Sequence, residues 1–396
     1  MIGRICNTST ALFRAVLLIF ACSLCLGACT APAPAEPQEA APAVQPQTVE
    51  PEPEPLPEMT DGPAVTVNGQ RLNDGSWLIE EVLYVRLWSL TQALDTDLTW
   101  DGQTAAFLWH GHEICLEAGS SQLLQDGEPI PLDAPLRRIL DEAYVPLESL
   151  AAHLLLGCYT EAETGHLYFT PGAAKFEVPA GYAVPTLMYH AVSDDLWGDA
   201  DLFVSPAELE KQLQYLLDNG YTPIHFGDLA YVDEIEKPVL LTFDDGYADN
   251  YHELFPLLQQ YGVKATIFVI TGSLDNHHLY MTWEQAKEMA DSGLVSIQSH
   301  TVDHPFLSGL SAEGQAEQME ASKLAILQHT GYEPYVLCYP TGVYDANTLA
   351  IIGDYYHFGL KMNGDAWYTD ENVYEINRWF VSRYTTLDRF IEMLES

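Results

Sequence analysis

Residues 239–246 read Val239-Leu240-Leu241-Thr242-Phe243-Asp244-Asp245-Gly246. A short apolar run that ends at a turn signal is typical of a strand buried on both faces, as in a parallel sheet covered by helices. Two carboxylates directly after such a strand are notable, because a buried charge is costly unless it is paired or bound to a metal. The stretch therefore predicts a strand that brings Asp244 and Asp245 to the carboxyl edge of a sheet.

Apolar runs and helical stretches alternate along the whole chain from residue 184 to residue 396. A helix is expected over 206–219, with Ser205 as its N-cap, Pro206 in its first turn and Gly220 after its end. Strands are expected at 186–190, 222–226, 238–244, 265–270, 295–300, 335–339, 357–362 and 376–382. This alternation predicts an α/β fold, a (β/α) barrel that is complete, distorted or incomplete.

Three other predicted strands also end in informative residues. His190 ends the strand at 186–190, His300 ends the strand at 295–300, and Pro340 follows 335–339, while His304 comes four residues after His300. Because the carboxyl ends of barrel strands all open on one rim, where active sites lie, we expect these residues to meet Asp244 and Asp245 there.

The residue types indicate a hydrolytic metal site. Two imidazoles and one carboxylate with an open position are a typical zinc ligand set, and a second carboxylate can accept a proton from water. A backbone N–H at a strand end can stabilise an oxyanion, and a further histidine can protonate the leaving group. A turn would explain the Asp-Asp-Gly sequence alone, and a solvated helix face would explain the two histidines alone. Both motifs together predict hydrolysis of an amide or an ester.

Two motifs resemble a known family. Thr242-Phe243-Asp244-Asp245-Gly246 and Ser299-His300-Thr301-Val302-Asp303-His304-Pro305 are similar to the first two motifs of the polysaccharide deacetylases (NodB-homology, carbohydrate esterase family four). The resemblance extends over roughly 185–385. It implies Asp244 as the general base, Asp245, His300 and His304 as metal ligands, and a divalent metal, with Zn²⁺ expected.

Cys338-Tyr339-Pro340-Thr341-Gly342 resembles the third motif of that family, in which the amide after the proline, here that of Thr341, helps to form the oxyanion hole. Two positions depart from the family pattern. Cys338 stands where an arginine is frequent, and Thr341 stands where an aromatic residue is usual. We expect Tyr247, Pro340 and Tyr344 to contact the substrate.

The catalytic acid and a base-orienting arginine follow from weaker similarities. The opening Leu187-Met188-Tyr189-His190-Ala191-Val192 resembles a subgroup that acts on poly-N-acetylglucosamine-type substrates, which makes His190 the expected acid. His357 is the alternative, since the usual Leu-His pair near the C-terminus is missing from the sequence. Arg378 resembles a late arginine that orients the base carboxylate, and a surface ion pair is the competing interpretation.

Residues 62–171 contain an internal repeat, because Tyr84-Val85-Arg86-Leu87 returns sixty residues later as Tyr144-Val145-Pro146-Leu147. The repeat predicts a small duplicated α+β domain. It resembles the copper amine oxidase N-terminal-type domain, which implies no copper here. His110 and His112, on one strand face near Cys115, could chelate a metal, but exposed histidines are the favoured interpretation. A Cys115–Cys158 disulfide and free thiols are both open.

The N-terminus predicts export. Residues 1–29 have an apolar run that ends in Leu26-Gly27-Ala28-Cys29, which resembles a bacterial lipobox with Cys29 as the lipidated residue. Residues 30–61 hold nine prolines, seven acidic residues and no basic one, which predicts a disordered tether. We therefore expect a lipid-anchored protein at the extracellular face of a bacterial cell membrane.

Composition limits the partners. The 396 residues include 16 Lys+Arg and 57 Asp+Glu, a formal net charge of −41. This charge argues against nucleic acid and against membrane contact other than through the lipid anchor, because phosphate recognition requires clustered cations. This charge would not repel a neutral acetylated polymer and would attract a deacetylated, cationic product. We therefore hypothesise processive or repeated action on partly deacetylated chains.

The leading functional prediction is a metal-dependent enzyme that removes N-acetyl groups from an extracellular N-acetylhexosamine polysaccharide, of peptidoglycan or poly-N-acetylglucosamine type. Two alternatives remain open at this point. One is a surface glycan-binding lipoprotein on a catalytically degenerate scaffold, and the other is an O-acetyl esterase.

Overall fold

The computed structural model describes residues 57–396, which belong to one compact unit. The predicted signal segment, the lipidation residue Cys29 and most of the predicted tether lie outside the described residues. Within 57–396, none of the helices combines the length and the apolar character that a membrane crossing requires.

The C-terminal region is built on a parallel sheet in which β20 (Pro238–Phe243) is an interior strand. Every residue of β20 is buried, and the strand pairs in parallel with β16 (Thr186–Tyr189) and β21 (Ala265–Val269). The strand order is β24-β23-β22-β21-β20-β16-β26, and β19 (Thr222–Pro223) also pairs with β20. The remaining strands of the path are β22 (Val295–Ser299), β23 (Val336–Cys338), β24 (Phe358–Leu360) and β26 (Trp379–Phe380).

One short segment connects the two edges of this sheet. Ile376 forms a parallel bridge to Leu360 at the end of β24, and three residues later β26 pairs in parallel with β16. The sheet therefore curves back on itself, and the α/β barrel class predicted from the alternating pattern is confirmed.

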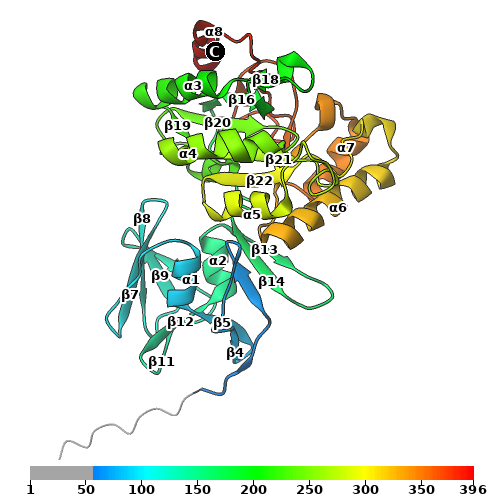
Figure 1. Ribbon diagram of the computed structural model, residues 1–396. Coiled ribbons are helices and arrows are strands. Elements are labelled where there is room, and N and C mark those ends of the chain that lie inside the picture. The colour runs from blue at the N-terminus through cyan, green and yellow to red at the C-terminus, as the bar shows by residue number, and fades with distance from the viewer. Residues whose placement is uncertain (1–56) are drawn as a thin grey trace, which may run out of the picture. The chain divides into compact units, whose positions relative to one another are not determined.

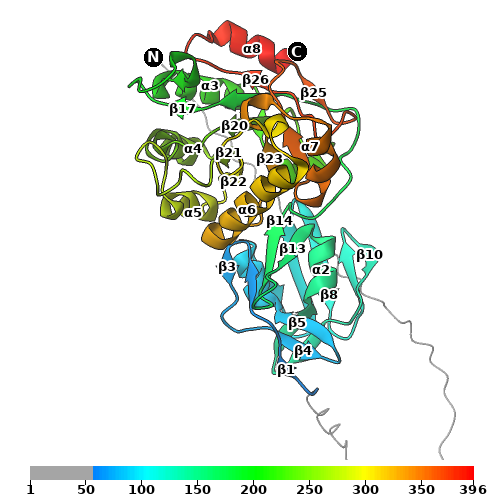
Figure 2. The same cartoon turned by 90° about the vertical axis from the view of Figure 1, so that its right-hand side faces the viewer.

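Helices follow one another around the outside of the sheet (Figures 1 and 2). Helix α8 lies beside α3, α3 beside α4, α5 beside α6, and α6 beside α7. Their bounds are α3 (Pro206–Asp218), α4 (Phe255–Tyr261), α5 (Trp283–Asp291), α6 (Ala312–Thr330), α7 (Ala346–Ile351) and α8 (Leu387–Glu395). Two pairs of two-residue strands complete the region: β15 (Ala183–Val184) pairs with β25 (Trp367–Tyr368), and β17 (Ala191–Val192) pairs with β18 (Phe203–Val204).

Helix α3 illustrates why these segments are helical. The Ser205 side chain accepts a hydrogen bond from the Glu208 N–H, Pro206 occupies the first turn, and the buried face carries Leu209, Leu213 and Leu216. The prediction of a helix over 206–219 is confirmed to within one residue.

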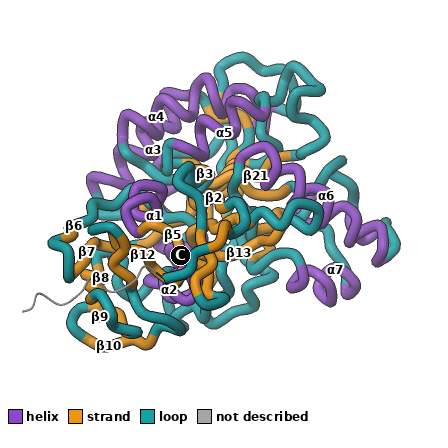
Figure 3. Tube along the Cα trace, turned by 90° about the horizontal axis from the view of Figure 1, so that it is seen from below, coloured by secondary structure: helices purple, strands orange, loops and turns teal. Residues whose placement is uncertain are grey.

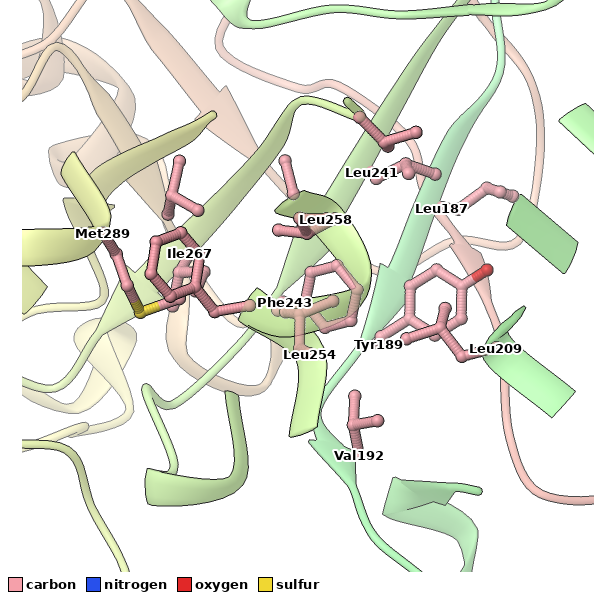
Figure 4. Close-up of a cluster of buried hydrophobic side chains, with 14 of the residues drawn as sticks. Leu187, Tyr189, Val192, Leu209, Leu241, Phe243, Leu254, Leu258, Ile267 and Met289 are labelled. Carbon is pink, nitrogen blue, oxygen red and sulfur yellow. The ribbon is translucent and has the colours of Figure 1, made fainter. Parts of the chain in front are cut away.

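The core between the sheet and helices α3 to α5 holds the central strands in place (Figure 4). The ring of Phe243 stacks on Tyr189 with centroids 4.9 Å apart, while Leu254 and Leu258 lie close to Phe243. Burial of each such side chain contributes about 1.5–3 kcal/mol. Because Phe243 and Tyr189 are the residues directly before Asp244 and His190, this packing fixes where those two polar residues begin.

The N-terminal folded region is mostly strand, with two short helices (Figure 3). Helix α1 (Leu87–Ala93) follows β5 (Val82–Arg86), and α2 (Leu147–His153) follows β12 (Glu142–Pro146). The two strands pair with each other antiparallel, so the sequence repeat is a duplicated strand–helix unit. The other strands are β1 (Thr60–Asp61), β2 (Val65–Val67), β3 (Gln70–Arg71), β4 (Trp77–Ile79), β6 (Thr99–Trp100), β7 (Thr104–Trp109), β8 (His112–Glu117), β9 (Gln122–Gln125), β10 (Glu128–Pro131), β11 (Arg137–Ile139), β13 (Leu156–Thr160) and β14 (Leu167–Pro171).

Several local expectations are wrong. His110 and Gly111 form the turn between β7 and β8, so His110 and His112 do not share a strand face. The His110 ring instead stacks on Tyr231, and His112 Nδ1 bonds to Asp126 at 2.7 Å. Neither histidine belongs to a metal-ligand group within the described chain.

Of the two open interpretations of the cysteines, free thiols are confirmed, because Cys115 and Cys158 are unpaired. Some element ends differ from expectation. β1 pairs with β4, so the folded chain begins two residues before the predicted boundary at 62. The expected strand 222–226 ends at Pro223, where Pro has no N–H for the ladder, and a 3₁₀ helix follows at Phe226–Tyr231.

Candidate metal and catalytic site

Four strands bring candidate site residues to one end of the barrel. Asp244 follows β20, His190 follows β16, His300 follows β22, and Pro340 follows β23 with one residue between. Asp244 is 2% exposed and His300 is also 2% exposed, although both are polar. The expectation that separate strands would deliver these residues to one place is met.

Asp244 forms a buried bidentate ion pair with Arg378. Arg378 Nη1 donates to Asp244 Oδ1 at 2.7 Å, and Nη2 donates to Oδ2 at 2.8 Å. The Arg378 side chain is fully buried, so the competing interpretation of Arg378 as part of a surface ion pair is wrong. Burial alone would raise the pKa of Asp244, but attraction and hydrogen bonding by Arg378 hold that pKa well below its usual range. Asp244 is therefore a carboxylate at neutral pH.

Asp245, His300 and His304 form a set that fits a divalent metal. One ligand atom of each lies within 4.8 Å of the others. Asp245 Oδ1 is 3.6 Å from His300 Nε2 and 3.8 Å from His304 Nε2. His300 Nδ1 lies 2.9 Å from the carbonyl oxygen of Cys338, and because a carbonyl can only accept, Nδ1 carries the proton. Nε2 of His300 is thus left as a lone-pair donor that faces Asp245, as in second-sphere orientation of metal-binding imidazoles.

A second group, Asp244, His300 and Cys338, meets the same distance condition. It is the poorer metal site. Both oxygens of Asp244 already accept hydrogen bonds from Arg378, and burial raises the pKa of the Cys338 thiol, which keeps it protonated. A thiol must lose its proton to bind a metal well. The donor set of Asp245, His300 and His304 is two imidazoles and one carboxylate, a combination that fits a divalent metal such as Zn²⁺.

The backbone is strained at this site. Asp245, Thr301, His304 and Thr341 all have positive φ angles, of 74°, 67°, 55° and 56°. Such conformations cost of the order of 1–3 kcal/mol each and concentrate at functional sites. Gly246 follows with φ of 79°, and a Cβ there would lie 2.9 Å from Val269 Cγ1, which explains the glycine of the Asp-Asp-Gly sequence.

His190 lies at the site and His357 does not. Nδ1 of His190 is buried without a hydrogen-bond partner within the described residues, and its ring meets Phe380 edge-on. Burial lowers the pKa of His190, and the carboxylates of Asp244 and Asp245 oppose this shift. His357 lies directly before β24, at the amino end of that strand, whereas the other site residues lie at the carboxyl ends of their strands. Its backbone N–H donates to the carbonyl oxygen of Tyr335. The structure therefore leaves His190 as the candidate acid.

The third motif forms a tight turn after β23. Pro340 is buried at the start of the turn, and Thr341 follows in the left-handed conformation. This geometry places the Thr341 amide directly after the strand end, where an oxyanion-binding amide is expected. Tyr344 packs its ring on Tyr339, and its hydroxyl donates to Glu375 Oε1 at 2.6 Å. Substrate contact by Pro340 and Tyr344 stays a prediction.

Tyr247 lies beside the expected metal ligands. It is 8% exposed and forms an antiparallel bridge to Tyr280, with the two rings 5.1 Å apart. Burial and the nearby Asp245 carboxylate raise the pKa of Tyr247, so its phenol stays neutral.

Two functional contacts were missed by the sequence reasoning. Cys338, noted only as a departure from the family, donates to Asp244 Oδ2 at 3.4 Å and accepts from Arg378 Nη2 at 3.0 Å. Asn250 Nδ2 donates to the His190 carbonyl at 2.9 Å and so braces the candidate acid. The closeness of Asn250 to the Asp-Asp-Gly turn was a usable signal, whereas nothing in the sequence placed the thiol on the base.

Comparisons with known proteins agree with this geometry. A family model described as polysaccharide deacetylase matches residues 232–357, and one described as copper amine oxidase N-terminal domain matches residues 66–168. The chain is 39% identical over 228 residues to the putative polysaccharide deacetylase YxkH of Bacillus subtilis (strain 168), a match that covers 56% of this chain and 79% of that protein.

A second relative is the poly-beta-1,6-N-acetyl-D-glucosamine N-deacetylase of Escherichia coli (strain K12). It is 28% identical over 205 residues, which are 46% of this chain and 30% of that protein. Among solved structures, the Streptococcus pyogenes deacetylase PplD in complex with acetate is 30% identical and has a TM-score of 0.51, covering 54% of this chain and 99% of that one.

Fold and site together define a hydrolase whose polar residues lie at the carboxyl end of an α/β barrel. The chain belongs to the polysaccharide deacetylase family, and it carries a copper amine oxidase N-terminal domain before the deacetylase region. Both resemblances stated from the motifs are confirmed.

Proposed function

We propose that this protein is a divalent-metal-dependent N-deacetylase of an N-acetylhexosamine polysaccharide. The observation that carries the proposal is the adjacency of two different carboxylates. Both oxygens of Asp244 accept hydrogen bonds from Arg378, whereas Asp245 faces two imidazoles. The activity named for the E. coli relative supports the same substrate class.

The chain's own residues supply the remaining chemistry. A bound zinc ion would polarise the acetamide carbonyl and increase the acidity of water at the site. Asp244, held as a carboxylate by Arg378, accepts the proton of the attacking water, and the Thr341 amide stabilises the oxyanion. His190 gives a proton to the sugar nitrogen as the C–N bond breaks. The products are acetate, which takes the water oxygen, and a free amine on the sugar.

The proposal is tested by acetate release from a panel of glycans: poly-β-1,6-N-acetylglucosamine, peptidoglycan, chitin oligomers and an O-acetylated polymer. We expect release from an N-acetylated glycan, its loss in Asp244→Asn, and retention of bound zinc in that variant. Asp303→Asn is the matched control, because Asp303 is an exposed carboxylate on the loop between the two imidazoles. Release only from the O-acetylated polymer would assign an esterase instead, and full activity in Asp244→Asn would refute the base assignment.

We also propose that the protein is attached by a lipid at Cys29 to the extracellular face of the bacterial cell membrane, with the Pro- and Glu-rich segment as a tether. The lipobox-like sequence before Cys29 supports this location. Cys29→Ser should move the protein from the membrane fraction to the medium, with its acetate release unchanged. Continued membrane association of that variant would contradict the anchor.

A further inference from the structure

An aromatic residue extends from the metal-ligand region toward solvent. The loop between β17 and β18, residues 193–202, begins three residues after His190. Trp197 in this loop meets Tyr247 edge-on, with ring centroids 4.6 Å apart, and meets Phe203 in the same manner at 4.8 Å. Tyr247 is two residues after Asp245, the candidate metal ligand. The Trp197 ring is therefore separated from the metal-ligand region by a single side chain, that of Tyr247.

Trp197 is held firmly and yet is open on one side. Its two edge-on contacts fix the ring orientation, because Phe203 and Tyr247 are themselves buried at 1% and 8% exposure. The side chain keeps 36% of its surface exposed. An oriented, solvent-open indole beside a catalytic site is the feature that stacks against the apolar C–H face of a sugar ring.

The charge of the same loop restricts which sugar fits. Residues 193–202 include Asp194, Asp195, Asp199 and Asp201 and no basic residue. An anionic sugar, such as a uronic acid, would be repelled at this loop, whereas a neutral N-acetylhexosamine or a cationic hexosamine would not.

We propose that Trp197 is a specificity-determining platform that stacks a neighbouring hexosamine ring of the polymer while another ring presents its acetamide to the metal site. This inference rests on the proposed function and deepens it, since it makes the enzyme depend on chain length. We therefore expect Trp197 to matter for turnover of a pentasaccharide and not for turnover of a small acetyl ester.

The test compares Trp197→Ala and Trp197→Phe with the wild-type, zinc-loaded enzyme on two substrates, a β-1,6-linked N-acetylglucosamine pentasaccharide and a small aryl acetate. Because one aromatic contact contributes roughly a tenfold change in an equilibrium constant, we expect Trp197→Ala to raise KM for the pentasaccharide about tenfold. Turnover of the aryl acetate should stay unchanged, and Trp197→Phe should recover part of the loss.

Trp88→Ala is the matched control, because Trp88 is a tryptophan 50% exposed on α1, in the N-terminal folded region. This control variant should change neither KM for the pentasaccharide nor turnover of the aryl acetate. An unchanged pentasaccharide KM in Trp197→Ala would overturn the inference, and so would an equal loss on both substrates, which would indicate general damage to the site.

Direct binding separates this inference from the proposed function. Calorimetric titration of the pentasaccharide needs no turnover. Binding by an inactive wild-type protein, lost in Trp197→Ala, would keep the platform and remove the deacetylase proposal. Turnover that is insensitive to Trp197 would keep the deacetylase and remove the platform.

Discussion

Arg378 and Asp244 lie 134 positions apart in the sequence and form two parallel hydrogen bonds of 2.7 and 2.8 Å between almost fully buried side chains. Arg378 Nη1 also donates to Thr242 Oγ1 at 3.1 Å, on the strand that carries the carboxylate. The guanidinium therefore sets both the charge and the direction of Asp244.

Breaking this pair should be costly. Arg378→Ala leaves a buried carboxylate without its partner, so we expect a loss of about 3–5 kcal/mol in the free energy of unfolding. The double variant Asp244→Asn/Arg378→Ala should lose less than the sum of the two single variants, because no unpaired charge remains. Urea denaturation of the four proteins measures this, and strictly additive losses would argue against a coupled pair.

His304 should be needed for metal retention but not for folding. Its side chain is 31% exposed, so His304→Ala removes one ligand without opening the core. We expect the purified variant to lose stoichiometric zinc and acetate release while it keeps the wild-type melting temperature measured without metal. His329→Ala, which changes an exposed histidine stacked on Trp283, serves as control and should keep its zinc. Full zinc occupancy in His304→Ala would remove it from the ligand set.

Thr341 should tolerate glycine. Its φ of 56° is unfavourable for a β-branched residue, and glycine adopts it without strain. Thr341→Gly keeps the backbone amide, so acetate release should stay within a few-fold of wild type while the free energy of unfolding rises by about 1 kcal/mol. A large loss of activity would show that the hydroxyl, and not only the amide, takes part.

Asp249 should make stability depend on pH. Burial raises the pKa of this carboxyl from 3.8 to about 6, and its Oδ2 is buried without a partner in the described chain. The folded state thus holds the proton between these values, and stability falls as pH rises from about 4 through 6. Asp249→Asn removes this penalty, so its melting temperature relative to wild type should be higher at pH 7.5 than at pH 4. A difference that is constant with pH would contradict the assignment.

The parallel architecture could be predicted because each strand is a local signal. An apolar run such as residues 239–243 is typical of a strand buried on both faces of a helix-covered sheet. The polar residue after each run marks the position where the strand ends. Short segments were predicted less well. The strand at 376–382 shrinks to Trp379–Phe380, because its position depends on pairing with β16 and on the bridge to β24 rather than on its own composition.

The sequence by itself determined the family, the Asp-Asp-Gly and His-x-x-x-His spacing, and the residue types at the rim, since all of these are local patterns. Tertiary structure decided which partners those residues have. It placed Arg378 and Cys338 on Asp244, assigned Asp245 to the imidazoles, and put His190 rather than His357 at the rim. These relations join segments far apart in the chain, and only the closure of the sheet brings such segments within hydrogen-bonding distance.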